Sequence, residues 1–343
     1  MLTLSLPLPV RDAAVDHLRD CLADASHLVS LIDAPSMEAA ANLDFMALIG
    51  LATMSPRCKD LAGECLHRRW CSFLRAIAPE LPAQVFIDAL KSTRSVFSGS
   101  ACIAFLFPPS TWKMGDVDVF CPQDNYDNFC DFLLHALPGT LILDQTKDDL
   151  AALSHDYHGR RVIGRRKIRT DNTTFDVLCA DSLCALTAVA SFFATHVMNV
   201  VTADSICIAY PLLLSQQRGL LRPFFNREVH GPLISKWQHR NFNLQEDRTL
   251  WQTSTSCNDP LLLCPRQLRY FGDPYCITFR FTNEYISHVQ RTELSANNEL
   301  LQHSLHMTAC WVLGGLPCGN PRCDLACPAC AEGFLLAKDI ELL

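Results

Sequence analysis

Apolar residues recur at helical spacing through the first quarter of the chain. The alanine-rich stretch 38–52 continues a pattern whose earlier positions include Leu18, Cys21, Leu22, Leu28 and Leu31. Short breaks at residues 33–36 and at Ser55-Pro56 divide this stretch into separate helices. No group of reactive side chains gathers here. We therefore interpret residues 1–80 as a helical packing region, with recognition of a protein partner as the alternative.

From residue 81 the pattern changes to short helices and strands in alternation. Helical spacing predicts helices over residues 81–94, 99–107 and 125–137, and runs of β-branched and aromatic residues predict strands over 95–97 and 116–122. Residues 160–169 and 173–180 flank a turn-rich tripeptide and predict a hairpin. The predicted fold class is α+β, with a small mixed sheet and flanking helices in a core over residues 81–221.

The remaining third of the chain has a weaker pattern. Residues 205–214 have strand character, and residues 276–294 predict a strand followed by a helix. Between them, the stretch from Arg222 to about Pro265 is polar and irregular. We therefore divide the chain at residues 80 and 221, which leaves an irregular C-terminal region, 222–343, that ends in a cysteine-rich tail.

One uncharged segment tests whether the chain enters a membrane. Residues 182–203 carry no formal charge and approach the length of a membrane span. Polar side chains are scattered through them, however, namely Thr187, Ser191, Thr195, His196 and Asn199. The segment therefore predicts a buried helix and no membrane contact, with His196 as a hydrogen-bonded core histidine rather than a ligand or a base.

Composition and charge narrow the possible functions. The chain has 343 residues, of which 49% are hydrophobic, so it can form a sizeable core. Its net charge of -7 argues against a protein that binds nucleic acid mainly through its overall electrostatic potential. A local basic patch is compatible with this net charge. Its 18 cysteines are too dilute for a disulfide scaffold, and its first residues lack the basic start of a signal peptide. We therefore expect a cytoplasmic protein.

The residues that point to chemistry begin with two aspartates on one predicted strand. Asp116 and Asp118 are two residues apart, so their side chains project from the same face of the strand. Two neighbouring carboxylates repel each other unless a cation lies between them. Asp176, on the predicted hairpin, is placed to add a third carboxylate. The three together predict a site for Mg²⁺ or Mn²⁺ with positions left for phosphate oxygens.

A short turn upstream has the features of a phosphate-binding segment. Gly99 follows a predicted strand and opens a predicted helix, where free backbone N–H groups favour an anion. Ser98 and Ser100 flank it and add hydroxyl groups. A phosphate cradle beside a carboxylate strand suits a metal-bound nucleoside triphosphate.

These motifs, in this order, resemble the nucleotidyltransferase superfamily typified by DNA polymerase beta. The matching segments are Phe97–Ser100, Asp116–Val119 and the single Asp176. The context also resembles uncharacterised fungal nucleotidyltransferase-like proteins, through the pattern Trp-x-x-Gly-Asp-x-Asp at residues 112–118 and through residues 192–199. The resemblance covers about residues 82–215, and its 15-residue gap between Ser100 and Asp116 is longer than the family usually has.

The resemblance implies a metal-dependent transfer of a nucleotidyl group from a nucleoside triphosphate to a hydroxyl group of an RNA, a protein or a small molecule. Asp116 and Asp118 would bridge two metal ions, and Asp176 would ligate the ion that activates the attacking oxygen. The alternative is a catalytically degenerate form of the fold that binds a ligand or docks a protein partner.

A basic run precedes Asp176 and has two interpretations. Its six cations are Arg160, Arg161, Arg165, Arg166, Lys167 and Arg169. They either form a solvated hairpin edge, which protects an exposed strand from pairing, or partly face the acidic site and hold a triphosphate or a polyanionic acceptor.

The C-terminal tail carries four closely spaced cysteines, Cys318, Cys323, Cys327 and Cys330, with Cys310 as a possible substitute ligand. Clustered thiolates in a turn-rich segment predict a structural Zn²⁺ site, which would be separate from the acidic site. Ordinary reduced cysteines and disulfides are the alternatives.

Overall fold

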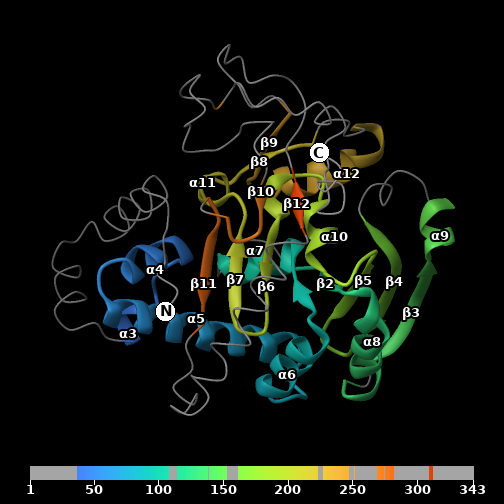
Figure 1. Cartoon of the computed structure of the whole chain (residues 1–343), viewed down its shortest axis with the longest axis horizontal. Helices are drawn as coiled ribbons and strands as arrows, with labels where there is room; N and C mark the ends of the chain where they lie inside the picture. Colours follow the sequence, from blue (N-terminus) through green and yellow to red (C-terminus); the bar gives the residue numbers. More distant parts are fainter. Residues whose placement is uncertain are drawn as a thin grey trace.

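A central eight-stranded sheet organises the chain in the computed structural model, which describes residues 37–107, 114–137, 139–152, 161–222, 227–246, 251, 269–273, 275–281 and 309–311. The strand order is β11-β7-β6-β1-β2-β5-β4-β3, and helices flank the sheet (Figure 1). Within this described sheet only β2 and β5 are parallel neighbours, and the other pairs are antiparallel. The predicted α+β class is confirmed, and the sheet is larger than the small one expected.

Several strands that are consecutive in the sequence, such as β2 and β3, are not neighbours in this sheet. The strands of the sheet are β1 (Val96–Phe97), β2 (Asp116–Cys121), β3 (Thr140–Thr146), β4 (Val162–Arg169), β5 (Thr174–Ala180), β6 (Asn199–Val201), β7 (Ser205–Ile208) and β11 (Ile277–Arg280). Two small sheets pair β8 (Arg218–Leu220) with β9 (Asn243–Gln245) and β10 (Arg269–Tyr270) with β12 (Cys310–Trp311). The strand at residues 116–122 and the hairpin of β4 and β5 are both as predicted.

The helices begin at the signals that the sequence carries. In the N-terminal region these are α3 (Met37–Ala40), α4 (Phe45–Ala52) and α5 (Pro56–Ile77). Asp44 and Ser55 accept hydrogen bonds from backbone N–H groups of the first turns of α4 and α5, as N-cap residues do. The helical prediction is confirmed over this part, whereas residues 1–36 lie outside the described chain.

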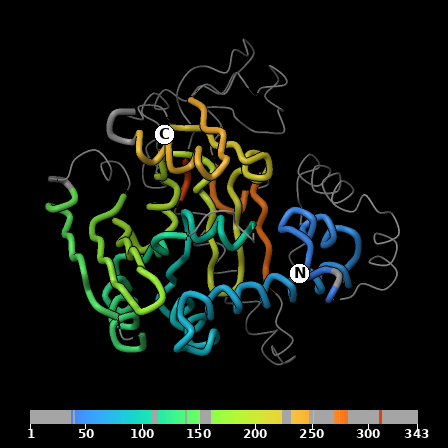
Figure 2. Tube along the Cα trace, turned by 180° about the vertical axis from the view of Figure 1, so that it is seen from behind, coloured from blue at the N-terminus to red at the C-terminus, as the bar shows by residue number. Residues whose placement is uncertain are grey.

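The three helices predicted over 81–94, 99–107 and 125–137 are confirmed as α6 (Ala83–Thr93), α7 (Gly99–Leu106) and α8 (Tyr126–His135). The remaining helices were not predicted with these bounds: α9 (Lys147–Ala152), α10 (Leu186–Ala190), α11 (Pro211–Ser215) and α12 (Arg227–Gln238). The stretch 205–214, predicted to have strand character, contains β7 and most of α11. Two short 3₁₀ helices are η1 (Gln123–Asn125) and η2 (Thr195–Val197). Both overall views place α12 at the opposite end of the sheet from α5 and α6 (Figures 1 and 2).

Alternate residues of the central strands pack into two separate apolar clusters. On one side the strands pack with residues of α5 to α8, and the strand residues are Val117, Val119, Phe175 and Val177. On the other side Phe120 and Leu178 pack with residues of α10. Asp116, Asp118 and Asp176 belong to this second side by the alternation of the strands. The site therefore lies on the α10 side of the sheet.

The uncharged segment 182–203 is not one helix, and this prediction is wrong. It contains the five-residue α10, the single turn η2 and the whole of β6. Strand β6 pairs with β1 and β7 and is buried along its length, and a strand covered on both faces is mostly apolar and lacks an alternating pattern. The pattern therefore could not distinguish it from a buried helix. Among the described residues, no helix is both long enough and apolar enough to cross a membrane.

The stretch 222–265 is more regular than predicted, because it contains α12 and β9. The polar composition of α12 and its internal Pro232 hide the helical spacing. The strand predicted from residue 276 is confirmed as β11, whereas the helix predicted after it lies outside the described residues. Strand β11 joins the main sheet beside β7, so the sheet includes a strand from beyond residue 221. The domain division itself stays a prediction.

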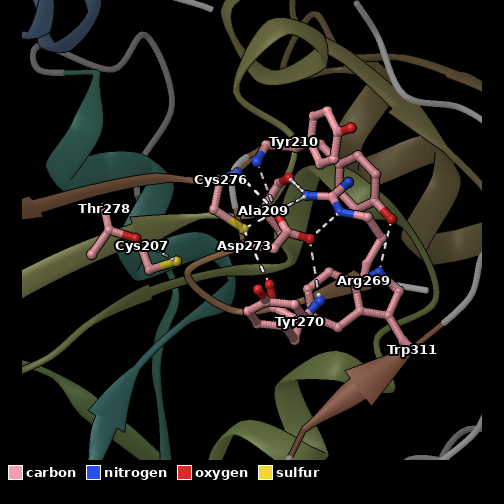
Figure 3. Close-up of polar contacts among 10 residues, drawn as sticks. Cys207, Ala209, Tyr210, Arg269, Tyr270, Asp273, Cys276, Thr278 and Trp311 are labelled. Carbon is pink, nitrogen blue, oxygen red and sulfur yellow. Dashed lines mark hydrogen bonds and ion pairs between the residues drawn. The ribbon is translucent and has the colours of Figure 1, made fainter. Parts of the chain in front are cut away.

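A buried ion pair connects the C-terminal strands to the sheet (Figure 3). Arg269 and Asp273 have side chains only 2% exposed and form a two-point pair. The guanidinium of Arg269 also donates to the Ala209 carbonyl over 2.8 Å and lies 4.7 Å from the ring centre of Tyr210. Because a buried charge needs partners, these contacts fix β10 against the segment that follows β7.

Candidate functional site

The three predicted carboxylates lie on one face of the sheet. Asp118 on β2 and Asp176 on β5 are register partners in the parallel pair, and Asp116 lies one side-chain repeat before Asp118. Asp176 is almost fully buried, with a side chain 8% exposed, whereas the side chain of Asp116 is 40% exposed. The acidic group therefore runs from the solvent, at Asp116, into the sheet.

The Gly99 turn lies directly against Asp118. Gly99 has a φ of +60°, a left-handed conformation, and a Cβ at this position would overlap the Asp118 carboxylate. The backbone N–H of Ser100 donates a hydrogen bond to that carboxylate. Glycine is therefore required here both by the backbone conformation and by the close approach of the acidic side chain.

Ser98 has a different role from the one predicted. Its hydroxyl donates to the carbonyls of Asn199 and Val197 over 2.6 and 3.3 Å, and the residue is fully buried. Ser100 is also buried, so the turn offers backbone N–H groups rather than free hydroxyls. The side chain of Ser98 thus attaches the turn to β6.

A small pocket adjoins the carboxylates. Asp118 and Asp176 form part of its wall, and the other lining residues are Phe120, Val162, Leu178, Ala188 and Phe192. Its volume of about 40 Å³ holds a few water molecules. The pocket therefore has a wall that is partly carboxylate and partly apolar, and it lies on the α10 side of the sheet.

Two cations of the basic run face the acidic group. Arg165 forms a two-point pair with Asp176, over 2.7 and 2.6 Å. The ammonium of Lys167 pairs with Asp116 and lies 3.7 Å from the carboxylate of Asp176. Arg166 points to the opposite face, where it pairs with Asp127 over 2.7 Å.

Strand β4 is an interior strand, since β3 covers its outer side and forms the edge. The interpretation of the run as an exposed hairpin edge is therefore wrong for its central part. Of the two interpretations, the one that directs cations at the acidic site matches the positions of Arg165 and Lys167.

Two further cations come from the stretch 222–265, in which no site residue was predicted. Lys236 on α12, and Arg240 just after it, both act electrostatically on Asp118. Burial and the nearby Arg240 lower the pKa of Lys236. Burial and the neighbouring Asp176 raise the pKa of Asp118 to about 7, and Lys236 opposes this shift.

His196 is buried as predicted, but it is not hydrogen-bonded within the described chain. Neither ring nitrogen has a partner there, and burial, with Arg240 nearby, lowers its pKa to about 3. The ring lies 4.6 Å from the ring of Trp237 and 5.0 Å from that of Phe242. This aromatic contact joins η2, whose Val197 carbonyl accepts from Ser98, to the end of α12.

The donor set fits a hard divalent cation in its chemistry, because all three side chains are carboxylates on one face. In the described residues, however, no three histidine, cysteine or acidic side chains converge on one point in metal-binding geometry. Arg165 and Lys167 pair with Asp176 and Asp116 instead. A metal at Asp116 and Asp176 therefore has to displace Lys167. The predicted zinc ligands Cys318, Cys323, Cys327 and Cys330 lie outside the described residues.

Comparison of the chain with known proteins gave no match to a family model, to a curated protein or to a solved structure. The functional argument therefore depends on the residues of this site.

Proposed function

We propose that this site transfers a nucleotidyl group from a nucleoside triphosphate to a hydroxyl acceptor, with pyrophosphate as the leaving group, in a nucleotidyltransferase-like fold. The observation that carries the proposal is the position of Asp118, which lies between the first turn of α7 and the carboxylate of Asp176. Because Asp118 adjoins both the Gly99 turn and Asp176, we infer that the phosphate-binding turn and the acidic group act on the same ligand.

The chain supplies several groups for the triphosphate. Gly99 lets the Asp118 carboxylate approach the backbone closely, and the backbone N–H of Ser100 in the first turn of α7 points to this carboxylate, next to which a phosphate would bind. Lys236 and Arg240 approach from α12 and add positive charge opposite the carboxylates. Phosphate oxygens favour such a set of N–H groups and cations.

The carboxylates have separate roles. Asp116 and Asp118 would hold Mg²⁺ or Mn²⁺, which supplies neutralisation of phosphate charge and activation of the attacking oxygen when bound. Asp176 would take part in the same cage and would accept the proton of the acceptor hydroxyl. Its two-point pairing with Arg165 fixes its orientation.

The acceptor is a hydroxyl group of an RNA, a protein or a small molecule, and the N-terminal helices are a candidate surface for a protein partner. We propose a cytoplasmic location. A structural Zn²⁺ in the C-terminal tail would be distant from this chemistry, because four protein ligands leave no position for a substrate.

The experiment incubates the chain with each labelled nucleoside triphosphate, Mg²⁺ or Mn²⁺, and RNA, protein or small-alcohol acceptors. We expect labelled product, and we expect the double variant Asp116→Asn, Asp118→Asn to lower the rate by about 10³-fold, because charge stabilisation is lost. Asp127→Asn is the matched control, since Asp127 pairs with Arg166 on the opposite face. Undiminished product in the double variant would refute the assignment.

A degenerate, non-catalytic binding module is the second candidate, and one observation favours it. Arg165 and Lys167 already neutralise Asp176 and Asp116 without a metal. A site of this kind would bind a nucleotide equally well with and without Mg²⁺ and would form no product. Nucleotide binding, measured with Mg²⁺ and again with a chelator in its place, separates the two candidates when it is combined with the transfer experiment.

A further inference from the structure

Lys167 lies where a metal ion would have to lie in order to join two of the carboxylates. It is the register partner of Asp176 across β4 and β5, so the two side chains share a face. Its ammonium pairs with Asp116 and is 3.7 Å from Asp176. One positive charge thus lies between the carboxylates of two different strands.

The two cations of β4 hold their carboxylates in different ways. Arg165 uses two nitrogen atoms against both oxygens of Asp176, a fixed geometry that a guanidinium favours. Lys167 has a single charge on a flexible four-carbon chain, and its side chain is 22% exposed. Lys167 can therefore leave its carboxylates more easily than Arg165, without a change in the strand.

A divalent cation and the ammonium of Lys167 cannot both occupy the space between Asp116 and Asp176. Their charges repel each other, and a metal needs the carboxylate oxygens that the ammonium already contacts. A phosphate group near the site would offer the displaced ammonium a new anionic partner.

We propose that Lys167 is an internal counter-ion that competes with the divalent metal for Asp116 and Asp176 and moves to the phosphates of the nucleotide when the metal binds. This inference rests on the proposed function and concerns its regulation. The metal alone binds weakly, because it must displace Lys167. Metal and nucleotide strengthen each other's binding, because the nucleotide stabilises the displaced lysine.

The experiment measures Mn²⁺ alone, without nucleotide, by the electron paramagnetic resonance signal of the free ion. We expect Lys167→Met to bind Mn²⁺ about tenfold more tightly than the wild type, the effect of removing one competing charge from a partly buried site. Lys167→Arg keeps the charge and is expected to stay close to the wild type. Thermal unfolding of each variant checks that it is folded, and Lys167→Gln provides a second neutral side chain.

Arg169→Met is the matched control. Arg169 lies on the same face of β4, one side-chain repeat beyond Lys167, and has no carboxylate partner in the described part of the chain. Equal affinities for Lys167→Met and Arg169→Met would overturn the proposal, because the effect would then be one of net charge. Weaker binding by Lys167→Met, or no binding by any variant, would overturn it as well. If Lys167→Met binds Mn²⁺ more tightly but the wild type transfers no nucleotidyl group, the proposed function is refuted. The competition between Lys167 and the metal is then still supported.

Discussion

Asp118 and Asp176 stand directly opposite each other in the parallel pair of β2 and β5, and Lys167 on β4 is opposite Asp176 on its other side. Three neighbouring strands thus place a row of charged side chains across one face of the sheet. In the adjoining row Phe120 and Leu178 are apolar and buried, and Arg165 is the residue of β4. Burial of charged side chains beside apolar ones costs desolvation free energy, and this cost is part of our reason for proposing a binding role for the row.

Replacement of Gly99 tests the contact between the turn and Asp118. Gly99→Ala places a Cβ in a left-handed position and against the Asp118 carboxylate. We expect a loss of about 1 to 3 kcal/mol in the free energy of unfolding, from backbone strain and the displaced side chain. Urea unfolding measures it. Gly115→Ala is the control, because a Cβ there meets nothing within 4 Å. A loss of equal size in both variants would contradict the assigned contact.

His196 predicts how stability depends on pH. Its folded-state pKa of about 3 is below the ordinary value of 6.5, so the unfolded chain takes up a proton first as the pH falls. The contribution of the neutral, buried His196 to the free energy of unfolding is fully present above pH 6.5. This contribution is lost progressively toward pH 3, at about 1.4 kcal/mol per pH unit. His196→Phe keeps a ring beside Trp237 and removes this loss, which urea unfolding over the same pH range detects.

The control for this prediction is His239→Phe, since His239 is exposed after the end of α12. We expect this variant to keep the pH dependence of the wild type. A His196→Phe variant that loses stability in acid as steeply as the wild type would show that other groups cause the loss.

The buried pair Arg269 and Asp273 predicts a large effect on stability. Arg269→Met leaves Asp273 buried, where the backbone N–H groups of Tyr270, Tyr275 and Cys276 are the remaining donors among the described residues. We expect a loss of about 3 to 5 kcal/mol in thermal or urea unfolding, because an unpaired buried charge is left behind.

The matched control is Arg280→Met. Arg280 pairs with Asp204 at 4.0 Å, and both side chains are 43% exposed. Such a pair contributes about 0 to 1 kcal/mol, so this variant is expected to unfold near the wild type. If Arg269→Met changed stability no more than Arg280→Met, the buried pair would not be what fixes β10.

The cysteine tail has a chemical test. We expect about one Zn²⁺ per chain by elemental analysis, because a Gly- and Pro-rich tail has little apolar surface with which to order itself. The double variant Cys323→Ser, Cys327→Ser is expected to lose the metal and to leave nucleotide binding nearly unchanged. A metal-free tail that resists protease equally well would contradict the zinc site.

Local patterns in the sequence were sufficient for the part of the site that comes from neighbouring strands. The alternation of Asp116 and Asp118 and the hairpin that carries Asp176 give the shared face directly, because side-chain direction in a strand has a period of two residues. The same rule places the side chain of Arg166 on the opposite face from those of Arg165 and Lys167. It does not predict whether β4 is an edge strand, because that depends on the pairing of β3 with its outer side.

The contributions of distant segments could not be predicted in this way. Lys236 and Arg240 act electrostatically on Asp118, although they are far from it in sequence. The hydrogen bond of Ser98 to the Asn199 carbonyl likewise depends on β6, a strand that the uncharged pattern of residues 182–203 did not predict. Tertiary contacts of this kind leave no periodic signal in the sequence.

The most direct test of the central claim is calorimetric titration with each of the four nucleoside triphosphates in the presence of Mg²⁺. At least one nucleotide is expected to bind the wild type and the control Asp127→Asn, and binding is expected to be lost in Asp118→Asn. Binding of none of the four to the wild type, or equal binding to Asp118→Asn, would contradict the claim that the Gly99 turn and the acidic row form a nucleotide site.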